Sequence, residues 1–261
     1  MRSRPLREIA LKSVLTGLLF LAMATIYAQA QPQNEDIPSG TILPVRLNAS
    51  IHSNNARPGQ AVTGRIMQDQ PLPSGGKVPA GSRVLGTVIT ASSAKAGGKA
   101  TLVLRFDTLE VRGQKIAITT NLRALASPTE VRLAQLPETS PDFGTPVSWE
   151  TTRQIGGDEV YGWYGVVTDQ MGQRVGTSVP DGVLVHVRAQ PGSKCRGELA
   201  GENSVQALWV FSSDACGVYG YDTLTVQHAG RSDPKGQIEL VSNKGELRLS
   251  EASGLLLRIE R

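Results

Sequence analysis

The residues best suited to bind a ligand form an aromatic cluster in the second half of the chain. Tyr161, Trp163 and Tyr164 lie within four positions of sequence. In a strand, successive side chains point to opposite faces, so Tyr161 and Trp163 would share one face and Tyr164 would take the other. Such rings could stack on a sugar or on a partner peptide, and the alternative is that they belong to the hydrophobic core.

The histidines do not indicate a metal site. The chain has three, His52, His186 and His228, and none has a second ligand at the spacing of a metal site. His186 alternates with Val185 and Val187, which predicts that it faces outward from a strand. We therefore expect no metal and no cofactor.

The sequence also gives little support for a hydrolase. The G-x-S-x-G pattern of an elbow-type serine hydrolase is absent. Residues 212–214, Ser-Ser-Asp, place hydroxyls beside a carboxylate, but neighbours along a strand or turn point apart, so Asp214 is expected to cap a turn. A glycosidase needs two carboxylates across a cleft, for which Asp142, Asp158 and Glu159 are weak candidates. The sequence therefore predicts no catalytic residue.

The first thirty residues are typical of a secretory signal peptide. A basic stretch with Arg2, Arg4, Arg7 and Lys12 precedes an apolar run over residues 14–28. The run ends in Ala28-Gln29-Ala30, the small-x-small pattern that signal peptidase cleaves, and cleavage would leave Gln31 as the first residue. A bilayer core needs about 20 apolar residues, so the short run favours a cleaved signal over a retained anchor, which is the alternative.

The expected cleavage changes the charge of the chain. The whole sequence has 27 Lys/Arg, 23 Asp/Glu and a formal net charge of +4. Removing residues 1–30 takes away four of the basic residues and one of the acidic ones, which leaves 23 and 22 and a net charge of +1. Nucleic-acid binding depends on clustered Lys and Arg that neutralise phosphates, so we expect no nucleic-acid partner. The expected location is periplasmic or secreted, with no transmembrane span after cleavage.

Export also indicates the state of the two cysteines, Cys195 and Cys216. The chain lacks the C-x-x-C pair of a redox motif and the close ligand spacing of a zinc site. In an oxidising compartment a single pair is expected to form a disulfide. That bond would close a loop of about 22 residues and would destabilise the unfolded chain by about 3 kcal/mol.

The mature sequence predicts a mainly β protein. Short β-like runs are separated by Gly and Pro, and no window outside residues 1–30 has a sustained 3.6-residue stripe. A short helical turn is expected within residues 123–135, and residues 101–106 resemble a strand that is buried on both faces or enters a core. The expected strands cover residues 41–47, 61–67, 83–91, 100–106, 109–111, 115–119, 160–167, 183–188, 207–211, 223–228, 238–241, 246–249 and 255–259.

The strands fall into two expected β domains. A polar tail, residues 31–36, leads into a first domain over residues 37–123. Residues 124–158 are poor in apolar periodicity and contain several prolines, which is typical of a linker or long loop. A second, sandwich- or barrel-like β domain that contains the disulfide would follow over residues 159–261.

Residues 37–118 resemble the β-barrel segment of the TrbI-like family, the core proteins of conjugation and type IV secretion. The resemblance consists mostly of turn residues and apolar alternation over about 80 positions. The matching positions are Gly40-Thr41, His52-Ser53-Asn54-Asn55, Pro58-Gly59, Pro79-Ala80-Gly81-Ser82-Arg83 with Gly86, and residues 102–106 leading to Leu109 and Gly113.

The resemblance implies a partial β-barrel in the cell envelope. The family's long Pro-rich stretch, its uncleaved inner-membrane helix and its pair of pore-forming amphipathic helices have no counterpart in the sequence, so a secretion channel is not implied. We therefore expect an exported, non-catalytic envelope protein that binds another protein or contributes to an assembly. The alternative is a periplasmic protein that binds or acts on carbohydrate through Tyr161, Trp163 and Tyr164.

Overall fold

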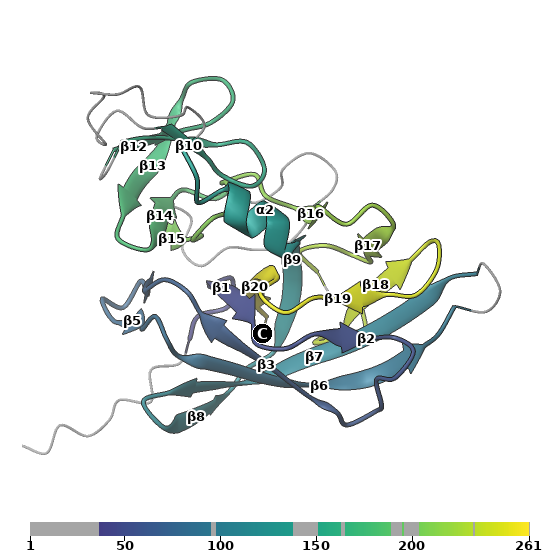
Figure 1. The fold of residues 1–261 in the computed structure, drawn as a ribbon. Coiled ribbons are helices and arrows are strands. Elements are labelled where there is room, and N and C mark those ends of the chain that lie inside the picture. The colour runs from purple at the N-terminus through teal and green to yellow at the C-terminus, as the bar shows by residue number, and fades with distance from the viewer. Residues whose placement is uncertain are drawn as a thin grey trace, which may run out of the picture. The chain divides into compact units, whose positions relative to one another are not determined.

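The computed structural model describes residues 37–94, 98–137, 151–162, 165–188, 195, 204–231 and 233–260 (Figure 1). Residues 37–261 form one compact unit. The expected signal peptide, its cleavage site between Ala30 and Gln31, and the polar tail lie outside the described residues. In the part of the chain that the structure describes, no helix is long and apolar enough to cross a membrane.

The fold is mainly β, which confirms the predicted class. Ten strands of the described residues form a large sheet in the order β16-β9-β20-β1-β3-β6-β7-β18-β17, with β8 also paired to β7. Neighbouring strands are antiparallel except β16 and β9. The strands are β1 (Ile42–Leu47), β3 (Ala61–Ile66), β6 (Arg83–Ser92), β7 (Ala100–Val111), β8 (Gln114–Ala117), β9 (Thr120–Ala126), β16 (Gly217–Tyr219), β17 (Leu224–Val226), β18 (Ile238–Ser242) and β20 (Gly254–Ile259).

A second sheet has six antiparallel strands in chain order (Figure 1). They are β10 (Thr151–Arg153), β11 (Glu159–Tyr161), β12 (Val166–Thr168), β13 (Arg174–Val179), β14 (Gly182–Val185) and β15 (Gln206–Ala207). Two short ladders pair β2 (Ile51–His52) with β19 (Arg248–Leu249), and β4 (Gln70–Pro71) with β5 (Lys77–Val78).

Two hydrophobic cores share three strands of the large sheet. The first core includes Val62, Val84, Phe106 and Leu240, and the second includes Val160, Val167, Val185 and Phe211. In β20, Leu255 and Leu257 belong to the first core whereas Leu256 belongs to the second. β1 and β9 divide their side chains between the two cores in the same way. These three strands therefore form a layer between the cores; β9 and β20 are buried on both faces, and β1 is buried except at Arg46.

The strand pairing corrects the expected division into two domains. β20 lies between β1 and β9, and β18 pairs with β7, so strands from both ends of the chain build one sheet. The expected linker, residues 124–158, contains the end of β9, the helix α2 (Pro128–Leu133) and β10. Local composition could not predict this, because the pairing partners are separated by more than a hundred residues.

The large sheet is not a closed barrel. Its end strands, β16 and β17, lie in contact but are not hydrogen-bonded to each other, and no closed barrel occurs among the described residues. The sandwich-like description of the fold is the one that fits.

Of the two alternatives predicted for residues 101–106, the structure shows a strand that enters the core with one face. The expected runs 100–106 and 109–111 form one continuous strand, β7, whose buried residues alternate with half-exposed ones such as Thr101 and Val103. Threonine and valine are tolerated on a half-exposed sheet face, so an unbroken β-prone run does not prove burial on both sides. The strands that are buried on both faces are β9 and β20.

The expected helical turn is confirmed at narrower bounds. α2 begins after Ser127, whose side chain accepts a hydrogen bond from the backbone N–H of Glu130 at 3.3 Å. This N-cap and the proline in the first turn mark the helix start. The residues before Ser127, expected in the same helical window, belong instead to β9.

The expected strand over residues 160–167 is wrong, because the chain turns within it. β11 ends at Tyr161 and β12 begins at Val166. Gly162 has a φ of 72°, and a Cβ on Gly165 would lie 1.4 Å from the carbonyl oxygen of Tyr161. Only glycine fits such a close approach of two backbone segments.

Truncating Leu257 in the shared layer tests whether the chain unfolds as one unit. This side chain of β20 is fully buried in the first core, so Leu257→Ala should lower the free energy of unfolding by about 2–5 kcal/mol. Urea denaturation should keep a single transition that moves to lower urea. Leu133→Ala, on the exposed side of α2, is the control and should change little. Two transitions of which one stays in place would contradict a shared sheet.

Candidate functional site

One candidate site among the described residues is a groove of about 630 Å³. It lies where the second sheet, α2 and the segment after β3 meet. We call it the groove. Its apolar lining comes from Met67, Ala134, Val160, Val179, Pro180, Val183, Trp209 and Val210, and its polar lining from Gln135, Thr152, Gln154, Ser178 and Asp181, together with Gly182. Apolar walls with a few polar groups are typical of a binding site.

The alternation of side chains along the strands determines which residues line the groove. Val160 in β11 and Val183 in β14 point to the inner face of the second sheet, where they are buried. The hairpin between β13 and β14 closes one side, and Asp181 in its turn has a φ of 68°. A Cβ on Gly182 would lie 2.6 Å from the Cα of Trp209, so glycine lets these two segments approach closely.

Trp209 lies at the groove in an uncommon backbone conformation. Its φ is 54°, in the left-handed region that bulky residues rarely adopt. Its N–H donates to Oε1 of Gln68 at 2.6 Å, and Nε2 of Gln68 donates to the carbonyl of Val183 at 2.8 Å. With the Gln154 amide oriented to donate, its nitrogen lies 3.0 Å from the Trp209 carbonyl oxygen. Such strain costs on the order of 1–3 kcal/mol and persists where the surroundings impose it, often at functional sites.

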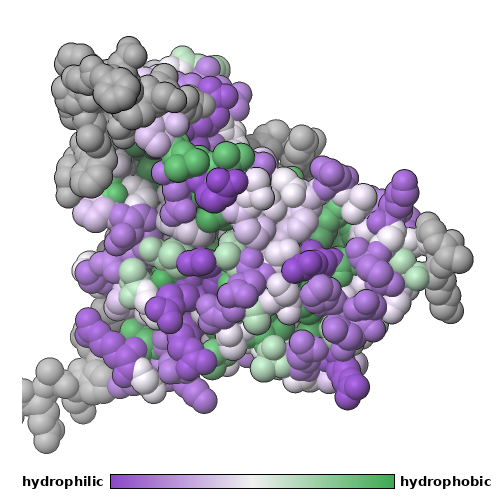
Figure 2. Space-filling model, viewed as in Figure 1, coloured by the Kyte–Doolittle hydropathy of each residue, from purple (hydrophilic) through white to green (hydrophobic). Residues whose placement is uncertain are grey.

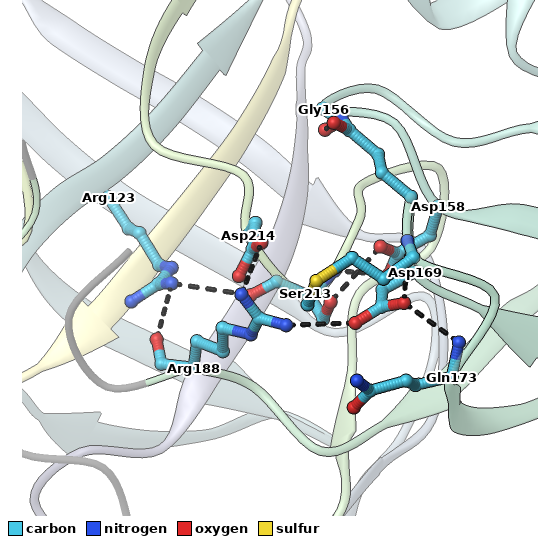
Figure 3. Close-up of polar contacts among 10 residues, drawn as sticks. Arg123, Gly156, Asp158, Asp169, Gln173, Arg188, Ser213 and Asp214 are labelled. Atoms are coloured by element: carbon cyan, nitrogen blue, oxygen red, sulfur yellow. Dashed lines mark hydrogen bonds and ion pairs between the residues drawn. The ribbon is translucent and has the colours of Figure 1, made fainter. Parts of the chain in front are cut away.

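A second group of polar side chains, shown in Figure 3, includes Ser213 and Asp214, which lie shortly before the disulfide-bonded Cys216 in sequence. Asp158 accepts hydrogen bonds from the Ser213 N–H at 2.6 Å and from the Ser213 hydroxyl at 3.1 Å. Arg188 pairs with Asp169 at 2.8 Å and with Asp214 at 3.4 Å. We call these five residues the acidic cluster.

Arg123 of β9 connects the large sheet to the acidic cluster (Figure 3). Its guanidinium donates to the backbone carbonyls of Arg188 at 2.8 Å, Ala215 at 3.0 Å and Ser213 at 3.4 Å. The residue is 1% exposed, and this burial lowers the pKa of its guanidinium to about 10, although nearby Asp214 favours the charged form. A buried arginine with three carbonyl partners fixes the position of the segment that carries those carbonyls.

The acidic cluster has a structural role. Burial raises the pKa of Asp158, and the neighbouring carboxylates of Asp214 and Asp169 raise it further, while the hydrogen bonds from Ser213 act in the opposite direction. Asp158, Asp169 and Ser213 are all nearly inaccessible to solvent. Because these three residues are buried, a substrate in solvent would not reach them. The sequence predicted that Asp214 caps a turn, but in the structure its carboxylate pairs with Arg188.

The predicted disulfide is confirmed. The Sγ atoms of Cys195 and Cys216 are 2.17 Å apart, and their Cα atoms are 5.8 Å apart. The backbone N–H of Cys216 donates to the hydroxyl of Tyr219 at 3.0 Å, and burial raises the pKa of that hydroxyl. Since β16 begins directly after Cys216, the disulfide anchors the segment that runs alongside β9.

The predicted aromatic site is described only at Tyr161. Its side chain is 48% exposed, and its hydroxyl donates to Oε2 of Glu159 at 2.6 Å. Because the adjacent Val160 points into the groove, Tyr161 faces the opposite side of the second sheet. The prediction that Tyr161 and Trp163 share one face required a strand that continues to Trp163, but β11 ends at Tyr161. Trp163 and Tyr164 lie outside the described residues.

The remaining predicted residues do not gather into a site. His186 is exposed, as expected, and no group of His, Cys, Asp or Glu that could hold a metal ion occurs among the described residues. Asp158 directly precedes β11 and Glu159 is its first residue, so their side chains point to opposite faces. Asp142 lies outside the described part of the chain.

Comparison of the sequence with family models and with curated proteins found no match, and comparison with solved structures found none either. The resemblance to the TrbI-like family therefore stays a prediction.

The raised pKa of Asp158 predicts a pH dependence of stability. Unfolded Asp has a pKa near 3.9, and the folded value is higher, so the folded state holds this proton to higher pH. The destabilisation due to this group therefore begins as pH rises above about 4 and is complete above the folded pKa. Asp158→Asn keeps the shape and can still bond to Ser213 but does not titrate. Its stability relative to the wild type should rise across that range in urea denaturation.

The exposed Asp222→Asn is the matched control, because it removes a carboxylate that lies on the surface. A difference between Asp158→Asn and the wild type that is constant from pH 3 to pH 8, or that shrinks as pH rises, would contradict the assigned burial effect.

Proposed function

We propose that this chain is an exported protein of the cell envelope that has no catalytic role and binds an extended segment of another protein in the groove. The observation that carries the proposal is the groove itself, with its apolar walls and its positioned polar groups. The signal-like residues 1–30 and the disulfide support export, since disulfides persist in oxidising compartments.

The groove has the properties of a peptide-binding site. Thr152 of β10 lines it, and β10 lies at one edge of the second sheet in the part of the chain that the structure describes. Extended peptides commonly bind by adding to such an edge, while side-chain pockets supply selectivity. The backbone of Trp209 is already held by Gln68 and Gln154, so little backbone ordering entropy would be lost there on binding.

Carbohydrate binding is the second candidate function, and Tyr161 favours it. Its ring is 48% exposed on the outer face of the second sheet, and Val166 of the neighbouring strand is 38% exposed. An exposed aromatic ring beside a carboxylate suits stacking on a sugar that also donates hydrogen bonds. This surface and the groove lie on opposite faces of the sheet, so variants can separate the two functions.

Filling the groove should abolish partner binding. In Ser178→Trp the added ring would occupy the groove, whereas Thr177→Trp, the matched control, places the same ring on the opposite face of β13. Immobilised protein would capture its partner from envelope extract, with the amount quantified by mass spectrometry. We expect Ser178→Trp to recover at least about tenfold less partner, equivalent to about 1.4 kcal/mol, and Thr177→Trp to recover the wild-type amount.

Equal capture by the two variants, both folded as judged by circular dichroism, would contradict binding in the groove. In the same series, glycan binding that Tyr161→Ala abolishes and Ser178→Trp leaves intact would favour the carbohydrate alternative. Turnover of a cell-wall glycan that a single point mutation abolishes would contradict a non-catalytic role.

A further inference from the structure

Cross-strand register places five charged residues in one line across the large sheet. Arg46 is paired with Arg65, Arg65 with Arg83, Arg83 with Glu110 and Glu110 with Lys115. Residues directly opposite each other in neighbouring strands share a face of the sheet. All are exposed except the half-buried Glu110. We call this line the basic row; it crosses β1, β3, β6, β7 and β8 (Figure 1).

The basic row works against the stability of the sheet. Like charges directly opposite in neighbouring strands are destabilising, and the row contains two such pairs, both of which include Arg65. Arg83 is partly compensated by Glu110 at 3.6 Å. Arg46 and Arg65 form no ion pair with any residue that the structure describes. β3 and β6 are interior strands of the sheet, so these charges do not protect an edge from aggregation.

The row has an uncharged line beside it on one side. In the next line along the strands, Thr63 is opposite Leu85, which is opposite Thr108, and none of these is charged. Figure 2 shows one face of the molecule, on which hydrophilic residues predominate and hydrophobic ones form small separate areas. Three adjacent arginines, Arg46, Arg65 and Arg83, beside an uncharged line fit a linear array of anions better than a broad anionic surface.

We propose that the basic row binds an acidic helical segment of a partner protein. Neighbouring strands lie about 4.8 Å apart, which sets the spacing of successive arginines. Glutamates three or four residues apart on a helix are separated by about 4.5–6 Å along its axis, so they can meet successive arginines in turn. Same-side residues of an extended chain are about 6.6–7 Å apart, which matches the row less well. The planar guanidinium binds a carboxylate through two parallel hydrogen bonds.

The basic row adjoins the groove. Arg65 lies two residues before Met67, which lines the groove, so one partner could contact both surfaces. The proposal does not rest on the groove, because a helix on the basic row needs none of the groove residues. Ser178→Trp should therefore leave binding to the row unchanged, and the two proposals can fail separately.

The test uses a labelled helical peptide of about six turns with glutamates along one face. The matched peptide has glutamines in their place. Fluorescence anisotropy with the purified chain at about 20 mM salt should show binding of the glutamate peptide at least tenfold tighter than that of the glutamine peptide, and weaker binding at about 200 mM salt. Arg65→Glu should weaken binding at least about tenfold, and Arg174→Glu, an exposed arginine of the second sheet, should not.

Arg65→Glu should also stabilise the protein, because it replaces two like-charge pairs by two opposite-charge pairs. We expect its Tm to rise by about 2–3 °C. Equal binding of the two peptides, or equal effects of Arg65→Glu and Arg174→Glu, would overturn the proposal. Binding to phosphatidylglycerol vesicles or to inorganic phosphate that depends on Arg65, with no binding of the glutamate peptide, would also overturn it.

Discussion

The buried guanidinium of Arg123 is the contact on which the arrangement of the two sheets depends. β9 places it at the boundary of the second core, where three backbone carbonyls from residues 188–215 accept its hydrogen bonds. A charge removed from water is costly unless its partners are well placed, so a shift of this segment would leave the cation unpaired. The disulfide next to it restricts the same segment. Together they position the strands and turns that line the groove.

The shared layer of β1, β9 and β20 gives this contact a rigid base. Its strands are buried except at Arg46, and each of them contributes side chains to both cores. The two proposed interaction surfaces use the molecule differently. The groove depends on residues from both sheets, whereas the basic row depends only on register within the large sheet. Loss of the second sheet's position would therefore affect the groove alone.

Parts of this structure follow from sequence because their signals are local. Alternation predicted β3, β6 and β18, and composition with the expected export predicted the disulfide. β9 was missed because its alanines and leucines favour helix and its buried Arg123 resembles a surface residue. Trp209 is buried with a positive φ, and its N–H is bound by Gln68, which is 141 residues away in sequence. The groove joins residues as far apart in sequence as Met67 and Val210, so no local pattern could reveal it, whereas the basic row depends on strand register that composition does not fix.

Native-state hydrogen exchange on Arg123→Met tests the role of this contact most directly. Methionine fills similar space but donates no hydrogen bond, so the carbonyls of residues 188, 213 and 215 lose their partner. The account predicts that amides of the second sheet and of residues 204–219 exchange at least about 100-fold faster, equivalent to about 3 kcal/mol, while those of β3, β6 and β7 keep their protection. Unchanged protection throughout, or an equal loss in both sheets, would contradict it.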